Sequence, residues 1–452
     1  MSILVIKFGG TSIKYGINNI INIINYYSEK WDKIIIVLSA LSQVTNLLID
    51  GLNNNSNLQK NIAEIRKSHK EILEINNKLI DDYLSEYDSI CNMAYKLKSY
   101  TPLLKDKIAS YGEFMSVNIV SEILKKKSIL HRTITSDEFI ITDDTYGEAY
   151  VDLIKTNHLI NSKLLKLFDA TNIILTTGFI GRNENNILTT LGRGGSDYTA
   201  TLIGSLVKAN EILIFSDVNG FLTADPKKHN SAQIIKTINI KEAAELSFFG
   251  AKIIHPKTIQ PLIKNNIPLR ILNTFDTKQE GTLIYNYKED NDNLIKGITS
   301  INNMDLFSIE GTGILGKVGI LSKIFKTISD LDISIPFITQ ASSETTICFA
   351  IKEEFTYIVN ESLKKSLEKE INSDYIQKIN IKKSVSLITI VGNNMKKIPG
   401  VAGKIFQEIG ENKINIIAIS QGSSEISITM VISDSDELDC IKILHRKFIE
   451  NL

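Results

Sequence analysis

The sequence predicts a layered α/β domain followed by two copies of a smaller βαββ unit. In the first two-thirds of the chain, short apolar runs alternate with stretches in which apolar residues recur at helical spacing, as in a mostly parallel sheet between helices. Residues 287–293 are polar and charged, which indicates a linker. Beyond them lie two similar copies of one segment at a constant offset of 81 residues, so that residue 306 aligns with residue 387.

The strands of the first domain are predicted from apolar runs. Four runs rich in isoleucine, leucine and valine are typical of parallel strands buried on both faces: residues 3–8, 34–38, 173–175 and 212–215. Residues 18–27 carry apolar residues at helical spacing, so we expect a helix between the first two strands. Residues 61–98 have a helical pattern but are largely polar, and we expect a helical excursion that faces solvent.

Each copy of the repeat predicts the same order of elements. Residues 306–311 align with 387–392, and residues 338–344 align with 419–425. Both copies read as strand, glycine turn, amphipathic helix, strand, polar turn and strand. We expect the two βαββ copies to pair into one larger module of sheet and helices.

Composition excludes several classes of function. The 452 residues include 51 Lys plus Arg and 51 Asp plus Glu, so no net charge attracts the chain to nucleic acid or an anionic membrane. The longest apolar run, residues 34–38, is too short to cross a bilayer, and a strand that begins at residue 3 leaves no room for a signal peptide. The three cysteines are far apart and form no CxxC pair, so the sequence supports neither a disulfide framework nor a zinc cluster. We therefore expect a reducing, cytoplasmic location.

The first motif that can carry chemistry is Lys-Phe-Gly-Gly-Thr-Ser at residues 7–12. A buried strand ends in Lys7, and two glycines and two hydroxyl residues follow it. Glycines let the backbone approach a ligand closely, and successive N–H groups bind anions. The order differs from that of a Walker A loop, where the lysine follows the glycines. Taken alone, the segment could be a plain turn after a strand.

A second glycine loop, at residues 191–198, precedes an apolar helical stretch. The N-terminus of a helix after a glycine turn binds anions, and Arg193 offers a two-pronged donor for a carboxylate. Asp197 falls in the first helical turn, where capping is the ordinary role of a carboxylate. One loop with lysine and one with arginine predict two anionic ligands, a phosphate and a carboxylate.

Four further spots carry weaker signals. Ser39 and Thr45 follow the strand at 34–38, at the sheet edge where α/β proteins bind ligands, although they could equally cap a helix. Glu113 is expected at the start of a helix, where a capping role is the simpler interpretation. Residues 215–227 are rich in turn formers and could be a surface hairpin. His255 has no partners at metal-binding spacing, so we expect it to be packed or to cap a helix.

Taken in order, these motifs resemble those of the aspartate kinases, enzymes of the amino-acid-kinase fold that phosphorylate the side-chain carboxylate of L-aspartate. The matching segments span the chain and are residues 7–12, 39–40 with Thr45, 112–113, 176–181, 189–198, 249–252 and 254–256, together with the doubled repeat. In that family the repeats are ACT domains, the first inserted into the second. The resemblance therefore implies a catalytic domain at 1–285, a linker and short strand at 286–303, and ACT domains at 304–380 and 381–452, the second including strand 295–301.

The resemblance also implies a role for each matching residue. Lys7 would stabilise the phosphoryl group in transfer, and Asp197 would orient Lys7 and the aspartate. Arg193 would hold the α-carboxylate of aspartate and Glu113 its α-ammonium, and the remaining substrate residues would be Ser39, Thr45, Gly194, Gly195 and Ser196. The resemblance implies that ATP is bound by Lys7, Gly9, Gly10, Ser12, Ser216, Asp217, Leu222, Lys227 and Lys252. Mg²⁺ would bridge the phosphates of ATP, and no residue of the chain is predicted as its ligand.

Three of the nucleotide residues depart from the family pattern. Ser216 stands where threonine is usual and keeps the hydroxyl, Leu222 replaces an aromatic residue, and Lys227 replaces an arginine. The last change keeps the charge but loses the two-pronged geometry. The departures concern the nucleotide contacts and leave the reaction unchanged. A carboxylate nucleophile has a pKa of about 4 and is ionised at neutral pH, so the reaction needs positioning and charge neutralisation but no general base.

Regulation is predicted from the repeats. Gln340 and Gln421 occupy equivalent positions and look like those of threonine-sensitive relatives, so we expect feedback inhibition by threonine, with lysine less expected, and a homo-oligomer formed through the ACT domains. A strand-end polar network without any ligand is the alternative. No GxGxxG unit of a dehydrogenase domain is present, so we expect a monofunctional kinase. Another amino-acid kinase and a catalytically silent ACT subunit are the competing functions.

Overall fold

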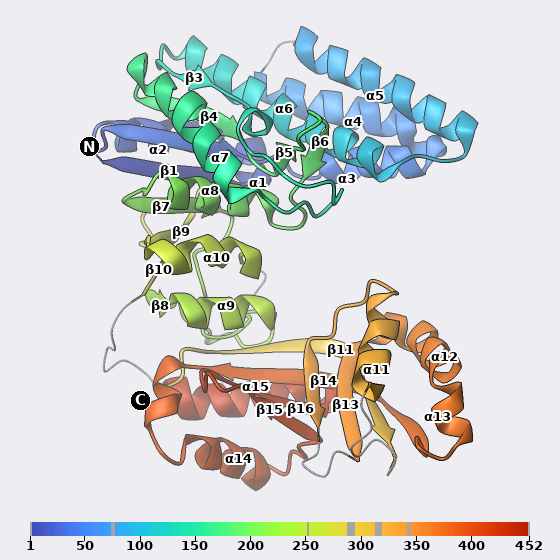
Figure 1. Cartoon of the computed structure of the whole chain (residues 1–452). Coiled ribbons are helices and arrows are strands. Elements are labelled where there is room, and N and C mark those ends of the chain that lie inside the picture. The colour runs from blue at the N-terminus through green and yellow to red at the C-terminus, as the bar shows by residue number, and fades with distance from the viewer. Residues whose placement is uncertain are drawn as a thin grey trace. The chain divides into compact units, whose positions relative to one another are not determined.

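The computed structural model describes residues 2–73, 77–250, 253–286, 294–311, 319–340 and 345–450 (Figure 1). The chain divides into two compact units. The first contains Met1–Phe221, Ile234–Ile240 and Lys252–Tyr287, and the second contains Leu222–Gln233, Lys241–Ala251 and Lys288–Leu452. The predicted linker at 287–293 lies outside the described residues.

An eight-stranded sheet forms the centre of the first unit. All neighbouring strands are parallel except β9 and β10, and the strand order is β3-β4-β2-β1-β7-β9-β10-β8. The strands are β1 Ile3–Phe8, β2 Lys33–Leu38, β3 Arg132–Thr133, β4 Ile173–Thr177, β7 Glu211–Ser216, β8 Thr237–Asn239, β9 Leu269–Asn273 and β10 Thr282–Tyr285. The four strands predicted from apolar runs are confirmed, and β1 lies at the centre between β2 and β7.

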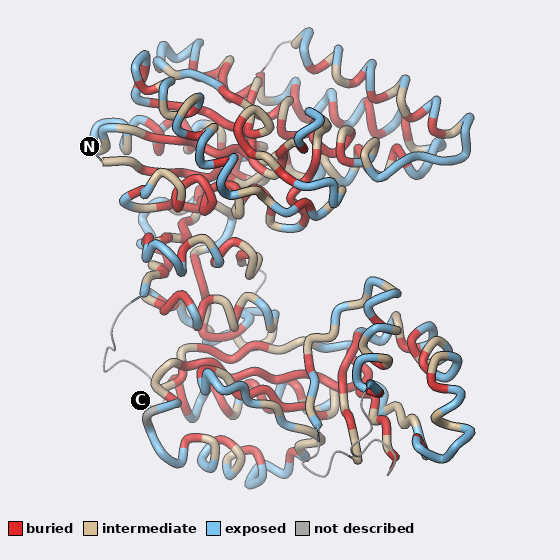
Figure 2. Tube along the Cα trace, viewed as in Figure 1, coloured by how far each residue is buried: buried red, intermediate tan, exposed pale blue. Residues whose placement is uncertain are grey.

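Helices cover this sheet and bury their apolar faces against it. In α2 (Ile17–Ser28), for example, four isoleucines spaced along one face are buried while the opposite face is exposed. Figure 2 shows how buried and exposed residues are distributed along the chain. The other helices of this unit are α1 Gly10–Tyr15, α3 Val44–Asn53, α4 Asn55–Leu73, α5 Lys78–Leu97, α6 Pro102–Lys126, α7 Leu153–Leu159, α8 Gly195–Leu206 and α10 Pro256–Asn265. Of these, α4 and α5 pack mainly against each other and against α3 and α6. A short antiparallel hairpin of β5 Ile180–Arg182 and β6 Leu188–Thr190 precedes α8.

Helix α6 corrects one sequence prediction. Thr101 caps its first turn by accepting a hydrogen bond from the N–H of Leu104, and Pro102 occupies the first helical position. Glu113 therefore lies in the middle of a 25-residue helix, eleven residues after its start, and does not cap it. The Gly112–Glu113 pair looked like a helix start because glycine weakens the helical pattern.

The second unit contains a six-stranded antiparallel sheet in the order β12-β13-β11-β14-β16-β15. Its strands are β11 Gly297–Glu310, β12 Phe337–Gln340, β13 Thr346–Lys352, β14 Lys378–Val391, β15 Ala418–Gln421 and β16 Ser427–Ser433. The two central strands pair along their whole length, with register shifts between Ile301 and Leu306. The segment 297–301 pairs with 387–391, and the segment 304–310 lies between β13 and the first half of β14.

Two helical layers cover the halves of this sheet. One core holds α11 (Ile320–Ser329) and α12 (Thr356–Ser366) against β11 and β13, and the other holds α14 (Val401–Glu411) and α15 (Glu437–His445) against β14 and β16. The remaining helices are α13 Glu368–Asn372 and α9 Ile240–Phe248. The predicted pairing of the two repeats is confirmed. The helices that follow the last strand of each repeat, α12 and α15, were not predicted. Among the described helices, none combines the length and the apolar character that a bilayer span requires.

Candidate active site

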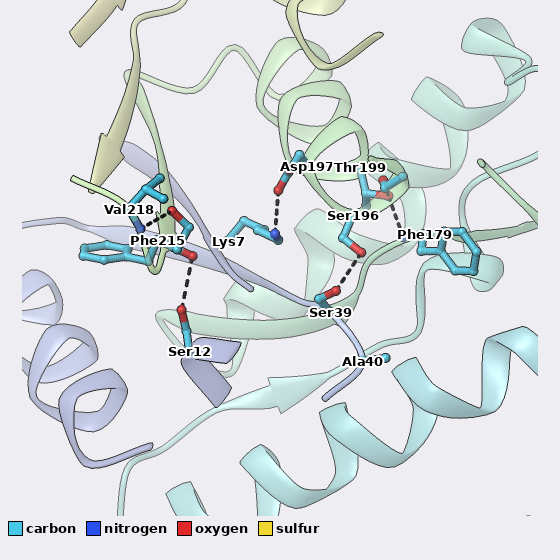
Figure 3. A network of polar contacts seen from close by, with 12 residues as sticks. Lys7, Ser12, Ser39, Ala40, Phe179, Ser196, Asp197, Thr199, Phe215 and Val218 are labelled. Carbon is cyan, nitrogen blue, oxygen red and sulfur yellow. Dashed lines mark hydrogen bonds and ion pairs between the residues drawn. The ribbon is translucent and has the colours of Figure 1, made fainter. Parts of the chain in front are cut away.

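Two charged side chains from distant motifs meet at the carboxyl end of the central strand. Lys7, near the end of β1, places its Nζ 2.6 Å from Oδ1 of Asp197 in the first turn of α8 (Figure 3). Their side chains are only 10% and 15% exposed. A lysine in the middle of a parallel sheet needs such a partner, because an unpaired buried charge costs several kcal/mol. The two sequence motifs therefore form one site.

The glycine loop after β1 is held close to the neighbouring strand connection. A Cβ atom on Gly10 would lie 2.3 Å from the carbonyl oxygen of Ala40, so only glycine fits there. The N–H of Gly9 donates to the carbonyl of Phe215 at 3.0 Å. Ser12 is fully buried, accepts from the Thr274 hydroxyl at 2.7 Å and reaches the Phe215 carbonyl at 3.5 Å. Ser12 thus anchors the loop to Thr274 and Phe215.

A cavity of about 400 Å³ opens beside the Lys7–Asp197 pair. All nine residues predicted as catalytic or substrate-binding line it: Lys7, Ser39, Thr45, Glu113, Arg193, Gly194, Gly195, Ser196 and Asp197. The Ser196 hydroxyl donates to the Ser39 hydroxyl at 3.3 Å, which joins the second glycine loop to the end of β2 (Figure 3). Gln43, not Ser39, occupies the N-cap position of the helix that follows, and it makes no side-chain capping hydrogen bond.

Glu113 is the most perturbed acid in the cavity. Its Oε1 accepts from the N–H of Ala40 at 3.2 Å, whereas its Oε2 is buried without a hydrogen-bond partner. Burial raises the pKa of Glu113 to about 8, and the Ala40 N–H and the more distant Lys7 lower it only in part. A buried acceptor without a partner is costly, so this carboxyl is prepared for a cationic ligand.

The second glycine loop is held by a carboxylate that the sequence did not single out. Asp106 on α6 accepts three hydrogen bonds, from the N–H and hydroxyl of Thr190 and from the N–H of Gly147, at 2.8–3.0 Å. Burial raises its pKa, while these hydrogen bonds act in the opposite direction. Asp106 lines the cavity floor beside the residues predicted to bind substrate. Its neighbours in the sequence are two lysines, a pattern that looks like an ordinary exposed helix turn.

His255 and Lys257 support the same loop from outside. His255 caps α10 by accepting from the N–H of Lys257 at 3.3 Å, as the sequence predicted. The His255 side chain lies so close to Gly194 that a Cβ atom there would be 2.5 Å away. Gly194 also has φ +71, a left-handed conformation that side chains disfavour. Lys257 donates to the carbonyl of Leu191 at 3.1 Å.

The residues predicted to bind the nucleotide are distributed over both units. Of that set, Lys7 lines the described cavity, and Gly9 and Gly10 form the loop beside it. Ser216 ends β7, next to β1, and Asp217 follows it as an exposed residue. Leu222 and Lys227 belong to the second unit, and Lys252 lies outside the described residues.

The two glutamines predicted to bind an effector take equivalent places in the second unit. Gln340 ends β12 and Gln421 ends β15, the two edge strands of the sheet. Both side chains are exposed. The Ser420 hydroxyl donates to the carbonyl of Ile338 at 3.3 Å, so the two edge strands lie close together.

The donor set of the cavity fits Mg²⁺ only in part. Mg²⁺ prefers oxygen ligands and is usually held by one or two carboxylates together with phosphate oxygens and water. Asp197, Ser39 and Thr45 line the cavity, as do the carboxyls of Asp106 and Glu113. Asp106 already accepts three hydrogen bonds and Asp197 pairs with Lys7, so these residues would suit an ion that arrives with a nucleotide better than a resident ion.

Comparison with known proteins agrees with this geometry. Residues 2–273 match the amino acid kinase family, and residues 307–367 and 388–448 match the ACT domain. The chloroplastic bifunctional aspartokinase/homoserine dehydrogenase 2 of Arabidopsis thaliana is 31% identical over 472 residues, covering 98% of this chain and 50% of the relative. The chloroplastic aspartokinase 3 of the same plant is 30% identical over 464 residues, covering 99% of this chain and 81% of the relative. The chain spans about half the length of the curated relatives it matches first.

Solved structures show the same architecture. The structure of E. coli aspartokinase III in complex with aspartate and ADP (R-state) has a TM-score of 0.83 and 27% identity, covering 98% of this chain and 99% of that one. The structure of the same protein with lysine and aspartate (T-state) has a TM-score of 0.78 and 28% identity, covering 99% of both chains. The predicted fold of a kinase domain followed by two ACT domains is confirmed. By its sequence and its fold, this chain belongs to the amino acid kinase family and, within it, to the aspartokinases.

Proposed function

We propose that this chain transfers the γ-phosphoryl group of ATP to the β-carboxylate of L-aspartate. The observation that carries the proposal is the convergence of four ionisable groups in one cavity: the Lys7–Asp197 pair, Arg193 and the buried Glu113. A cation near the end of the central strand suits a phosphoryl group, and an arginine with a buried carboxyl suits the two ends of an amino acid. Bound aspartate and ADP in E. coli aspartokinase III support the same assignment.

Substrate binding follows from the cavity wall. Arg193 is exposed there and would hold the α-carboxylate with two N–H donors, assisted by the hydroxyls of Ser39 and Thr45. Glu113 would take the α-ammonium on its unpartnered Oε2. Because both α groups of the amino acid are then held, its β-carboxylate is free to point towards Lys7.

Phosphoryl transfer then requires positioning and charge neutralisation. A β-carboxylate oxygen would attack the γ-phosphorus while the bond to the β-phosphate oxygen breaks and ADP leaves, and no proton moves. Lys7, held by Asp197 at 2.6 Å, would neutralise the charge of the phosphoryl group in transfer. The N–H of Gly10 would bind a phosphate oxygen. The N–H of Gly9, which donates to the carbonyl of Phe215, and the hydroxyl of Ser12 would act by anchoring that loop. Mg²⁺, when bound with the nucleotide, would supply further neutralisation of phosphate charge.

The remaining nucleotide contacts are proposed by similarity alone. Ser216, Asp217, Leu222, Lys227 and Lys252 match the positions at which the family binds ATP. The three cysteines are free thiols, which supports a cytoplasmic location for the reaction.

A coupled assay of ADP release tests the proposal. Wild-type protein with L-aspartate, ATP and Mg²⁺ should release ADP in proportion to aspartate, and Lys7→Ala should release at least about a hundredfold less. Lys30→Ala is the matched control, because Lys30 is an exposed lysine at a helix end outside the cavity. No aspartate-dependent ADP release from the wild type would reject the proposal, and no ADP release at all would favour a silent regulatory subunit instead.

We further propose that an amino acid bound at the edge strands of the ACT sheet inhibits the kinase. Gln340 and Gln421 offer amide donors and acceptors at equivalent ends of β12 and β15, which supports threonine, whereas the lysine complex of E. coli aspartokinase III supports lysine. The ACT domains would also join two copies into a homo-oligomer. Rates with millimolar threonine or lysine, in wild type and in Gln340→Ala, separate the two effectors. Inhibition by lysine alone would reject threonine.

A further inference from the structure

A cluster of two histidines and one glutamate lies in the second unit, outside everything assigned to catalysis or feedback. His229 comes from the segment 222–233, His445 ends α15, and Glu450 follows in the next turn. The Nε2 of His229 and the Nδ1 of His445 each lie 2.8 Å from Oε1 of Glu450. One ligand atom of each residue falls within 4.8 Å of the others. We propose that this cluster binds a divalent transition-metal ion, best Zn²⁺.

The ligand chemistry favours zinc over the hard cations. Two imidazole nitrogens and one carboxylate oxygen are ligands that Zn²⁺ takes in tetrahedral sites, whereas Mg²⁺ and Ca²⁺ prefer oxygen alone. Tetrahedral ligands about 2.0–2.1 Å from Zn²⁺ lie roughly 3.3–3.4 Å apart. Each ring of the cluster would therefore move about half an ångström away from Glu450. The side chain of Glu450 is 28% exposed, so a fourth position remains open to water.

The surroundings hold the rings in place and give His445 a second partner. The side chain of His445 is fully buried, and its Nε2 lies 2.8 Å from the hydroxyl of Thr223. With Nδ1 on a metal, the Nε2–H would donate to that hydroxyl, and such a partner on the far nitrogen is typical of metal-binding histidines. Thr223 is itself fixed by the N–H of Gln233 at 2.9 Å.

The segment that carries His229 is independently anchored to the same unit. Lys228 pairs with Glu437 at 2.8 Å and also donates to Ser300, and Ala224 is buried in the core that contains α15. His229 is therefore presented to the C-terminal helix without any metal, which lowers the entropy cost of binding. A bound ion would fix the 222–233 segment to the end of α15. The sequence could not reveal this site, because its histidines are separated by more than 200 residues.

Metal titration of the full chain tests the inference without any readout of kinase activity. Protein freed of metal with EDTA is titrated with Co²⁺, followed by visible absorption, and with Zn²⁺, followed by calorimetry, in the absence of nucleotide and Mg²⁺. We expect one equivalent to bind. His229→Gln and Glu450→Gln should each weaken binding by about 100-fold or more, because even outer-shell changes at metal sites cost 10- to 100-fold.

His158→Gln is the matched control, because His158 is an exposed histidine on α7 in the first unit. It should bind Co²⁺ as the wild type does. Absence of stoichiometric binding by the wild type would show that the cluster is only a hydrogen-bond network. Unchanged binding by both His229→Gln and Glu450→Gln would place any metal elsewhere, and either result overturns the inference.

Discussion

Raising the pH from 6 to 8 should strengthen the capture of aspartate, because Glu113 must lose its proton before it can pair with an ammonium group. With the pKa of Glu113 raised to about 8, roughly 1% of the free enzyme is ionised at pH 6, about 9% at pH 7 and half at pH 8. The carboxylates of aspartate stay ionised throughout this range. The kcat/KM for aspartate should therefore rise about ninefold from pH 6 to pH 7 and about fivefold from pH 7 to pH 8.

The assay is the initial rate of ADP release at saturating ATP and Mg²⁺ with aspartate varied at each pH. Glu113→Gln should abolish the rise and raise the KM for aspartate at pH 8 by about tenfold to a hundredfold, the value of a charged hydrogen bond. Glu122→Gln, a change at a partly exposed residue near the end of the same helix and outside the cavity, should keep the wild-type profile. A flat wild-type profile, or the same slope in Glu113→Gln, would refute the reasoning.

Three further outcomes are expected. Without substrate, the wild type should lose about 2 kcal/mol of unfolding free energy between pH 6 and pH 8, because the pKa of Glu113 lies above its unfolded value and stability falls as pH rises towards that pKa. Urea unfolding at both pH values should show a smaller loss for Glu113→Gln, and equal losses would contradict the assignment. Gly10→Ala should destabilise the protein by about 1–3 kcal/mol, because the added Cβ would meet a backbone oxygen, whereas Gly403→Ala on α14, where no atom lies close to the added Cβ, should stabilise it by about 0.5–1 kcal/mol. Thermal melts that reverse this order would contradict the packing argument. Arg193→Lys should raise the KM for aspartate about tenfold or more with a smaller change in kcat, since lysine cannot form the two-pronged contact, and an unchanged KM would remove Arg193 from substrate binding.

Much of the fold could be predicted because its signals are local. Buried parallel strands read as unbroken apolar runs, and the repeat corresponds to the two halves of the second sheet. The helices α12 and α15 were not predicted, because the aligned segments of the two copies end before them. The position of Glu113 was misjudged because Gly112 interrupts the helical pattern of α6, and a residue's depth within a long helix depends on the distant cap at Thr101.

The site was predictable where motifs carry it and unpredictable where only folding assembles it. Lys7 and Asp197 stand out as part of glycine loops, and the predicted charge partners do line one cavity. Asp106 has no such signal, because its three hydrogen-bond donors come from residues at least 41 positions away. Long-range contacts of this kind are set by tertiary packing, which a single sequence does not reveal.

The two long strands at the centre of the second sheet have a consequence for how the regulatory repeats unfold. The first half of β11 borders one core and its second half lies in the other, and β14 is shared in the same way. Unfolding of one repeat would remove a hydrogen-bonded strand from the other. The repeats should therefore exchange their amide hydrogens as one cooperative unit, and a local change at either edge strand can affect both repeats through the fourteen-residue strands β11 and β14.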